Sequence, residues 1–150
     1  MFRGVSSLSL DSKGRMVMPS RYRQKLQDSC GGQLVITVDP DHCLLIYALP
    51  EWEEIEAKLT ALPSLNKQAR KLQRLLVGHA TEVEMDGSGR VLIPPPLRGF
   101  AELEKHVVLT GQGRKFELWD ETMWNEKRDA WMDEDLDLEN LPVELETLSF

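Results

Sequence analysis

The chain has 150 residues, of which 41% are hydrophobic and 29% charged, and its formal net charge is −7 at pH 7. This composition is typical of a globular protein and excludes fibrous and strongly disordered classes. The longest apolar run, residues 43–49, is far shorter than the roughly 20 residues of a membrane-spanning helix, so we expect no membrane span. The N-terminal residues lack the apolar core of a secretory signal, and the two cysteines do not form a C-x-x-C pair. We therefore expect a cytoplasmic protein with free thiols.

The charge is unevenly distributed along the chain. Residues 1–25 contain six basic residues and one acidic residue, which gives this segment a charge of +5. Residues 76–100, by contrast, contain two basic and three acidic residues, for a charge of −1, and residues 133–150 carry seven carboxylates without any lysine or arginine. The pattern predicts a basic working surface near the N-terminus and an acidic tail, although uneven surface charge alone would produce the same counts.

An internal repeat relates residues 8–23 to residues 83–98 at an offset of 75. The residues identical in the two copies are Asp11, Gly14, Arg15, Pro19 and Arg23, which recur as Asp86, Gly89, Arg90, Pro94 and Arg98. Apolar positions recur between them, which predicts two structural units related by a pseudo-two-fold axis.

Each copy is expected to contain the same series of elements. In the first, polar–apolar alternation around residues 8–10 predicts a strand, and the D-S-K-G-R sequence closes a hairpin in which Gly14 supplies a positive φ. A second strand, residues 16–18, stops at Pro19, which begins a short helix that ends at residues 31–32. Strands at residues 33–38 and 43–48 then form a hairpin. In the second copy, residues 111–113 are the expected loop of that hairpin.

Helical segments are expected after each copy. Apolar spacing predicts one helix near residues 52–62 and another near residues 65–76, capped by Ser64 or Asn66 and ending at Gly78. The polar face of the second helix is basic; it is either a solvated face or a secondary contact for phosphate or a partner. Asp120 is the expected cap of a C-terminal helix whose tryptophans, Trp124 and Trp131, belong to the core or to a protein interface.

Units of about 50 residues have little core of their own, so we expect the two to pack into one mainly β body with short helices and interleaved hairpins. Nothing in the sequence predicts catalysis. The three histidines are scattered, and the glycine pairs at residues 87–89 and 111–113 lack the remainder of a phosphate-binding loop. We therefore predict a non-enzyme without metal, cofactor or small-molecule ligand.

The duplicated D-x-x-G-R turn is the candidate functional feature, because it presents Arg15 and Arg90 directly after a tight loop. One interpretation is structural: Asp11 and Asp86 hold the turn by bonding the arginine and the loop amides. The other is a basic ribbon that binds phosphates and guanine edges, since arginine suits bidentate recognition of guanine and a two-stranded ribbon fits the major groove. The basic residues of this predicted ribbon are Arg3, Lys13, Arg15, Arg21 and Arg23.

This order of elements resembles the AbrB-type swapped-hairpin family of bacterial DNA-binding proteins. Two copies in one chain look like the MraZ family in particular, and the likeness extends from residue 1 to about residue 131. The motifs that carry it are MFRG, LDSKGR, PSRYR, LPEWE, RLLVGHATEVEMDGSGR, LIPPPLR and KFELWDE. The resemblance implies a pseudo-two-fold double barrel of two SpoVT-AbrB domains, residues 5–51 and 80–123. A helical linker (52–79) joins them, and a helix with an acidic tail (124–150) follows.

The family motif D-x-x-x-R falls on Asp11 and Arg15 in the first copy and on Asp86 and Arg90 in the second. The resemblance assigns DNA contact to these arginines and to positions 3 and 23, with Gly14 and Gly89 shaping the turns. The second copy departs from the basic pattern, because it has Ser88 in place of Lys13 and Pro96 in place of Arg21. We therefore expect a weaker DNA contact at Arg90.

The resemblance also implies the biological role. It predicts a transcriptional repressor that binds short tandem repeats in the promoter of its own division-and-cell-wall operon, as a ring-shaped homo-oligomer on the nucleoid in the cytoplasm. Its expected partners are double-stranded DNA and other copies of the chain. The alternatives are an antitoxin-like protein of the same fold and a protein-binding ring scaffold that does not bind DNA.

Overall fold

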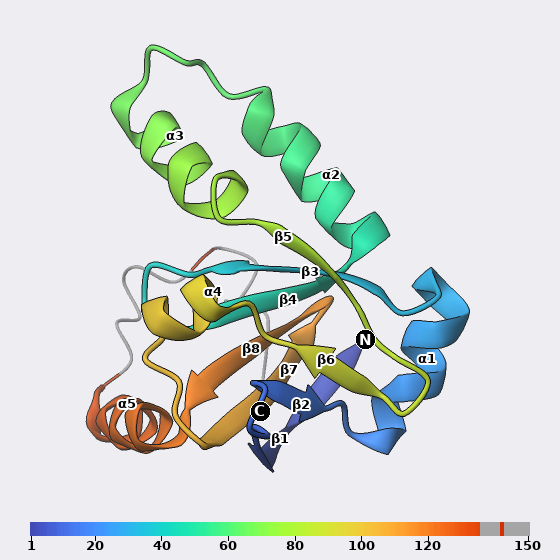
Figure 1. Cartoon of the computed structure of the whole chain (residues 1–150). Coiled ribbons are helices and arrows are strands. Elements are labelled where there is room, and N and C mark those ends of the chain that lie inside the picture. The colour runs from blue at the N-terminus through green and yellow to red at the C-terminus, as the bar shows by residue number, and fades with distance from the viewer. Residues whose placement is uncertain (136–141, 143–150) are drawn as a thin grey trace.

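The computed structural model describes residues 1–135 and 142 (Figure 1). Its strands are β1 (Phe2–Ser9), β2 (Arg15–Val17), β3 (Gln33–Val38), β4 (Leu44–Ala48), β5 (Thr81–Glu84), β6 (Arg90–Leu92), β7 (His106–Gly113) and β8 (Lys115–Asp120). Its helices are α1 (Ser20–Cys30), α2 (Leu49–Thr60), α3 (Lys67–Leu72), α4 (Pro95–Phe100) and α5 (Glu121–Asp133), and a π-helical turn, η1 (Gln73–Val77), continues α3. The mainly β fold with short helices is thus confirmed.

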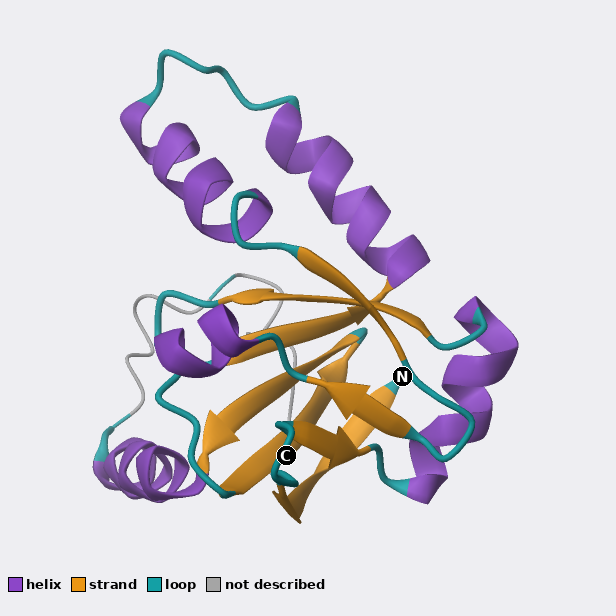
Figure 2. Ribbon diagram, viewed as in Figure 1, coloured by secondary structure: helices purple, strands orange, loops and turns teal. Residues whose placement is uncertain are grey.

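The strands of the two copies are exchanged. The large sheet has the order β1-β7-β8-β4-β3-β5, and β2 pairs with β6 in a separate two-stranded ribbon (Figure 2). Strand β1 of the first copy pairs with β7 of the second, from Phe2 opposite Gly113 to Ser9 opposite His106. Strand β5 of the second copy pairs with β3 of the first. The predicted interleaving of the hairpins is therefore confirmed.

The exchange produces one core from both copies. Met16 and Leu26 of the first copy and Val91 and Ile93 of the second are completely buried in the same cluster. Neither copy encloses these side chains alone, as expected for units of this size.

Most predicted boundaries agree with the structure, and two local predictions were wrong. The loop expected at residues 111–113 lies further along the chain, because β7 continues to Gly113. Gly111 lies inside the strand, where β1 passes so close that a Cβ atom would lie 2.5 Å from the backbone nitrogen of Arg3. Asp120 precedes α5 as predicted, but its side chain does not cap the helix; its carboxylate accepts a hydrogen bond from the Glu104 amide instead.

Helices α2 and α3, with η1, form a hairpin that projects from the sheet (Figure 1). At its base, Trp52 packs in a second buried cluster with Val35, Leu45 and Tyr47. Asn66, one of the two expected caps, accepts hydrogen bonds from the Gln68 and Ala69 amides.

At the other end of the molecule, Trp119 of β8 and Trp124 and Trp131 of α5 lie in mutual contact, with ring centroids 5.9–6.0 Å apart. The predicted acidic tail falls almost entirely outside the described residues. No helix within the described ranges is long and apolar enough to cross a membrane.

Candidate nucleic-acid interface

The first D-x-x-G-R turn is held by the carboxylate of Asp11. Its Oδ1 accepts hydrogen bonds from the amides of Lys13 (3.0 Å) and Arg15 (2.9 Å), and its Oδ2 accepts one from Nε of Arg15 (2.8 Å). The hydrogen bond from the Arg15 backbone, together with that from its side chain, lowers the pKa of Asp11, so the carboxylate is ionised at neutral pH. Gly14 completes the turn with a φ of +82°, a conformation that glycine adopts readily.

The second turn repeats this geometry. Asp86 accepts hydrogen bonds from the amides of Ser88 and Arg90, both at 2.9 Å, and from Nε of Arg90 at 2.7 Å. Gly89 has a φ of +78°. In both copies the carboxylate thus bonds the arginine and the loop amides. This bonding is compatible with DNA contact, because in the described structure the carboxylates engage only Nε of each guanidinium and leave the terminal nitrogens available.

The ribbon of β2 and β6 brings the two turns onto one surface. Its register pairs Arg15 with Leu92, Met16 with Val91, and Val17 with Arg90. Met16 and Val91 point into the core and are fully buried. Since side chains alternate along a strand, the other four residues lie together on the opposite face, which we call the outer ribbon face: Arg15, Val17, Arg90 and Leu92.

Each turn is covered by an arginine from the other copy. A Cβ atom at Gly14 would lie 2.4 Å from Cζ of Arg98, and one at Gly89 would lie 2.5 Å from Nε of Arg23. Arg23 also donates a 2.6 Å hydrogen bond from Nε to the carbonyl oxygen of Met18. Nε of Arg98 is buried and has no hydrogen-bond partner within residues 1–135 and 142. Each turn is thus supported by an arginine of the other copy. Nε of Arg23 has a hydrogen-bond partner, whereas Nε of Arg98 has none among the described residues.

Comparison with known proteins identifies the family of the chain. The family described as "MraZ protein, putative antitoxin-like" matches the chain twice, over residues 1–75 and 76–137. The chain belongs to the MraZ family. Proteins named transcriptional regulator MraZ from Thioalkalivibrio sulfidiphilus and Methylococcus capsulatus are each 60% identical to it, over 149 and 152 residues, covering 99% and 100% of both chains. The one from Pseudomonas putida is 59% identical over 126 residues, or 83% of each chain.

The structure divides the predicted basic residues among three places. Lys13 and Arg15 lie at the first turn. Arg3 is on β1, one of the two edge strands of the large sheet, and Nη2 of Arg21 donates to Oγ of Ser6 on the same strand at 2.5 Å. Arg23 lies at the second turn, at the opposite end of β2 from Arg15. The five basic side chains expected from the sequence therefore lie at the first turn, on and beside β1, and at the second turn.

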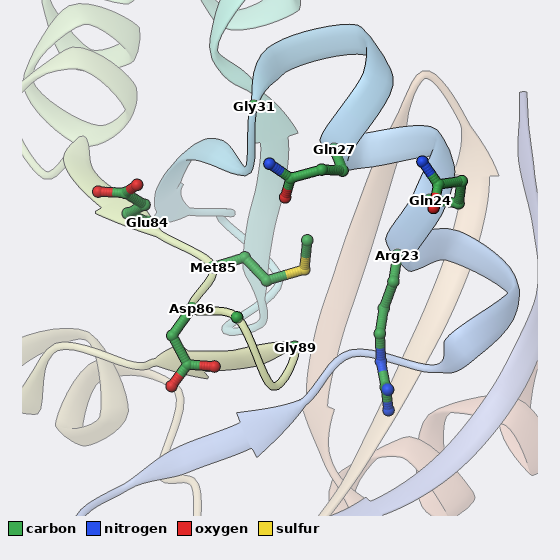
Figure 3. A pocket seen from close by; sticks show the side chains of 9 residues that line it. Arg23, Gln24, Gln27, Gly31, Glu84, Met85, Asp86 and Gly89 are labelled. Atoms are coloured by element: carbon green, nitrogen blue, oxygen red, sulfur yellow. The ribbon is translucent and has the colours of Figure 1, made fainter.

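A shallow groove adjoins each of the two turns. One, of about 440 Å³, lies between α1 and the second turn, with Arg23 on one side and Glu84 and Asp86 on the other (Figure 3). Its counterpart beside the first turn, about 460 Å³, is lined by Arg98 and Lys105 as well as by Asp11 and Glu104. Within the described residues, no group of three or more His, Cys, Asp and Glu side chains could hold a metal ion.

Sequence reasoning missed two features of this interface. The repeat matches Arg98 to Arg23, but the position of Arg98 over the first turn follows only from the strand exchange. Val17 and Leu92 belong to predicted strands, and the sequence analysis gave them no functional role, although they are 43% and 46% exposed on the outer ribbon face. Alternation with the buried Met16 and Val91 is the sequence signal that could have identified them.

Proposed function

We propose that this protein is a DNA-binding transcriptional repressor that uses the outer ribbon face to read the major groove. The observation that carries the proposal is the paired Asp–Arg geometry, in which Asp11 and Asp86 orient Arg15 and Arg90 on one exposed two-stranded ribbon. The B-DNA major groove is about 12 Å wide and admits a ribbon of this kind, and a guanidinium held in place can bind O6 and N7 of guanine. The names of the curated relatives support the same function.

The first turn is the stronger contact in this proposal. Lys13 is exposed beside Arg15, whereas the equivalent position of the second turn is Ser88. Strand β5 leads into the second turn and carries two exposed carboxylates, Glu82 and Glu84. Their negative charge would repel a DNA phosphate at this turn. We therefore assign the leading role in specific binding to Arg15 and a smaller one to Arg90. Arg3, Arg21 and Arg23 supply secondary backbone contacts or support.

Self-association completes the proposed mechanism. A net charge of −7 and one small ribbon per chain make a single contact weak and sensitive to salt. In a ring-shaped homo-oligomer, once one chain has bound a promoter repeat, the other chains are held close to the neighbouring repeats. Their binding is then intramolecular, which raises the avidity by about 10²–10⁴-fold. The edge strands β1 and β5 offer surfaces for such association. The site of action is the nucleoid in the cytoplasm, and the target is the promoter of the protein's own division-and-cell-wall operon.

The test is a gel shift and footprint on the DNA upstream of the gene, with variants matched in charge. Arg15→Gln is expected to weaken specific binding about fivefold to 150-fold, the range that one bidentate base contact contributes, and Arg90→Gln to weaken it less. Arg114→Gln is the control, since it removes the same charge from a side chain that is 71% exposed at another site. If Arg15→Gln binds the DNA as tightly as the wild type, at unchanged Tm, the proposed role of Arg15 in base recognition is contradicted.

An antitoxin-like role is the second candidate, because the matching family carries that description. In that case, the chain would bind a basic toxin partner as well as DNA. Co-purification of a stoichiometric basic protein expressed from the neighbouring gene would favour it. A protein-binding ring scaffold would neither shift the upstream DNA nor be retained on heparin.

A further inference from the structure

The outer ribbon face carries two apolar side chains. Val17 and Leu92 are 43% and 46% exposed, although the two strands already supply Met16 and Val91 to the core. The face holds only four side chains, and the other two are Arg15 and Arg90. Two exposed aliphatic side chains therefore share the surface assigned to DNA with two oriented guanidinium groups.

The register places each apolar side chain beside an arginine of the other copy. Val17 is directly opposite Arg90, and Leu92 is directly opposite Arg15. Side chains directly opposite in an antiparallel pair have Cβ atoms about 4.5–5.5 Å apart. The arrangement repeats under the pseudo-two-fold relation between the copies, so each half of the face contains one cation and one aliphatic group.

We propose that Val17 and Leu92 contact the 5-methyl groups of thymines in the major groove, next to the bases bound by Arg15 and Arg90. The proposal rests on the proposed function and adds a specificity determinant to it. Thymine is the base that presents an apolar group in the major groove, where small aliphatic side chains contact it. The two strands of the ribbon lie about 4.8 Å apart, so the ribbon fits within a groove about 12 Å wide.

Charge identifies duplex DNA rather than a protein as the occupant of this face. Each aliphatic side chain lies opposite an arginine, and the carboxylates of the two turns, Asp11 and Asp86, are both engaged by those arginines. Lys13 adds a further exposed cation at the edge. A polyanion with small apolar groups on its surface matches this combination, and the major groove of thymine-containing DNA has both properties.

The experiment uses the full-length protein and two duplexes of its upstream footprint. In one duplex, every thymine of the protected segment is replaced by deoxyuridine, which keeps base pairing but lacks the methyl group. The wild type is expected to bind the deoxyuridine duplex more weakly, by about fourfold for each thymine methyl that it touches, the factor that corresponds to one buried methylene group. Val17→Ala and Leu92→Ala are expected to weaken binding to the thymine duplex while responding less than the wild type to removal of the methyls.

Leu65→Ala is the matched control, because Leu65 is 91% exposed in the loop between α2 and α3 and lies outside the outer ribbon face. It should bind both duplexes like the wild type. Equal wild-type affinity for the two duplexes would overturn the inference and leave the proposed function intact, whereas binding to neither duplex would overturn the proposed function. Light scattering gives a further outcome. If Val17→Ala or Leu92→Ala changes the oligomer size but still binds the deoxyuridine duplex as much more weakly as the wild type does, the pair belongs to contacts between copies of the chain, and the inference is overturned.

Discussion

Replacing Gly14 by alanine tests whether the strand exchange supports the first turn. Gly14 has a φ of +82°, and the left-handed region costs an L-residue about 1–2 kcal/mol. The new Cβ atom would also lie 2.4 Å from Cζ and Nη1 of Arg98, so the guanidinium must move. Gly14→Ala is therefore expected to lower the free energy of unfolding by at least the backbone cost, even though the turn is on the surface.

The expected size is measurable by thermal unfolding. For a chain of this length, about 1 kcal/mol corresponds to roughly 2–4 °C in Tm, so Gly14→Ala should lower Tm by about 2–8 °C. Gly87→Ala is the control in the equivalent loop, because a Cβ atom there meets nothing within 4 Å. It should change stability by no more than about 0.5 kcal/mol. Both should be measured by circular dichroism at one protein concentration, since self-association raises Tm.

A second variant separates the backbone cost from the displacement of Arg98. In an Arg98→Ala background the guanidinium is absent, so Gly14→Ala should cost less than it does in the wild type. Such non-additivity is expected of residues in direct contact. Equal costs in the two backgrounds would refute the cross-copy support, and a Tm for Gly14→Ala equal to that for Gly87→Ala would refute the strained turn.

Two further predictions concern titratable groups. The backbone and side-chain hydrogen bonds from the arginines lower the pKa of Asp11 and of Asp86, so the stability that they contribute is present above the usual pKa of 3.8 and is lost as pH falls through the lower pKa of the folded state. In urea unfolding from pH 5 downward, the free energy of unfolding of the Asp11→Asn/Asp86→Asn variant should therefore fall less steeply with pH than that of the wild type. An unchanged slope would contradict this. Burial raises the pKa of the Cys43 thiol. When the native protein is alkylated and the products are identified by mass spectrometry, the half-buried Cys30 should therefore react first and Cys43 only after unfolding. Early labelling of Cys43 would contradict its burial.

Features governed by local chemistry could be predicted from the sequence. The D-x-x-G-R turns require a carboxylate that accepts amide hydrogen bonds and a glycine with positive φ, and both are properties of neighbouring residues. The same holds for the start of α1 after Pro19 and its end at Gly31, which adopts the left-handed conformation. In each case the interaction that decides the structure lies within five residues of sequence.

Features decided by the partner strand could not be predicted in the same way. Gly111 has the character of a loop residue because glycine is frequent in turns, but its position is fixed by the approach of β1 from the other copy. Asp120 has the chemistry of a helix cap, yet its carboxylate accepts a hydrogen bond from the Glu104 amide instead. Interleaving was expected from the small size of the units, whereas the pairings β1–β7 and β3–β5 required the structure.

The strand exchange also changes how the two copies compare in charge. Counted along the sequence, Arg23 belongs with Arg15 and Arg98 with Arg90; in space, Arg98 covers the first turn and Arg23 covers the second. Each turn thus has one arginine of its own and one from the other copy. The difference between the turns is then Lys13 against Ser88, together with the carboxylates of β5, rather than the +5 and −1 of the two sequence segments. Besides Arg90 and Leu92 on the outer ribbon face, the second copy thus places Arg98 over the first turn.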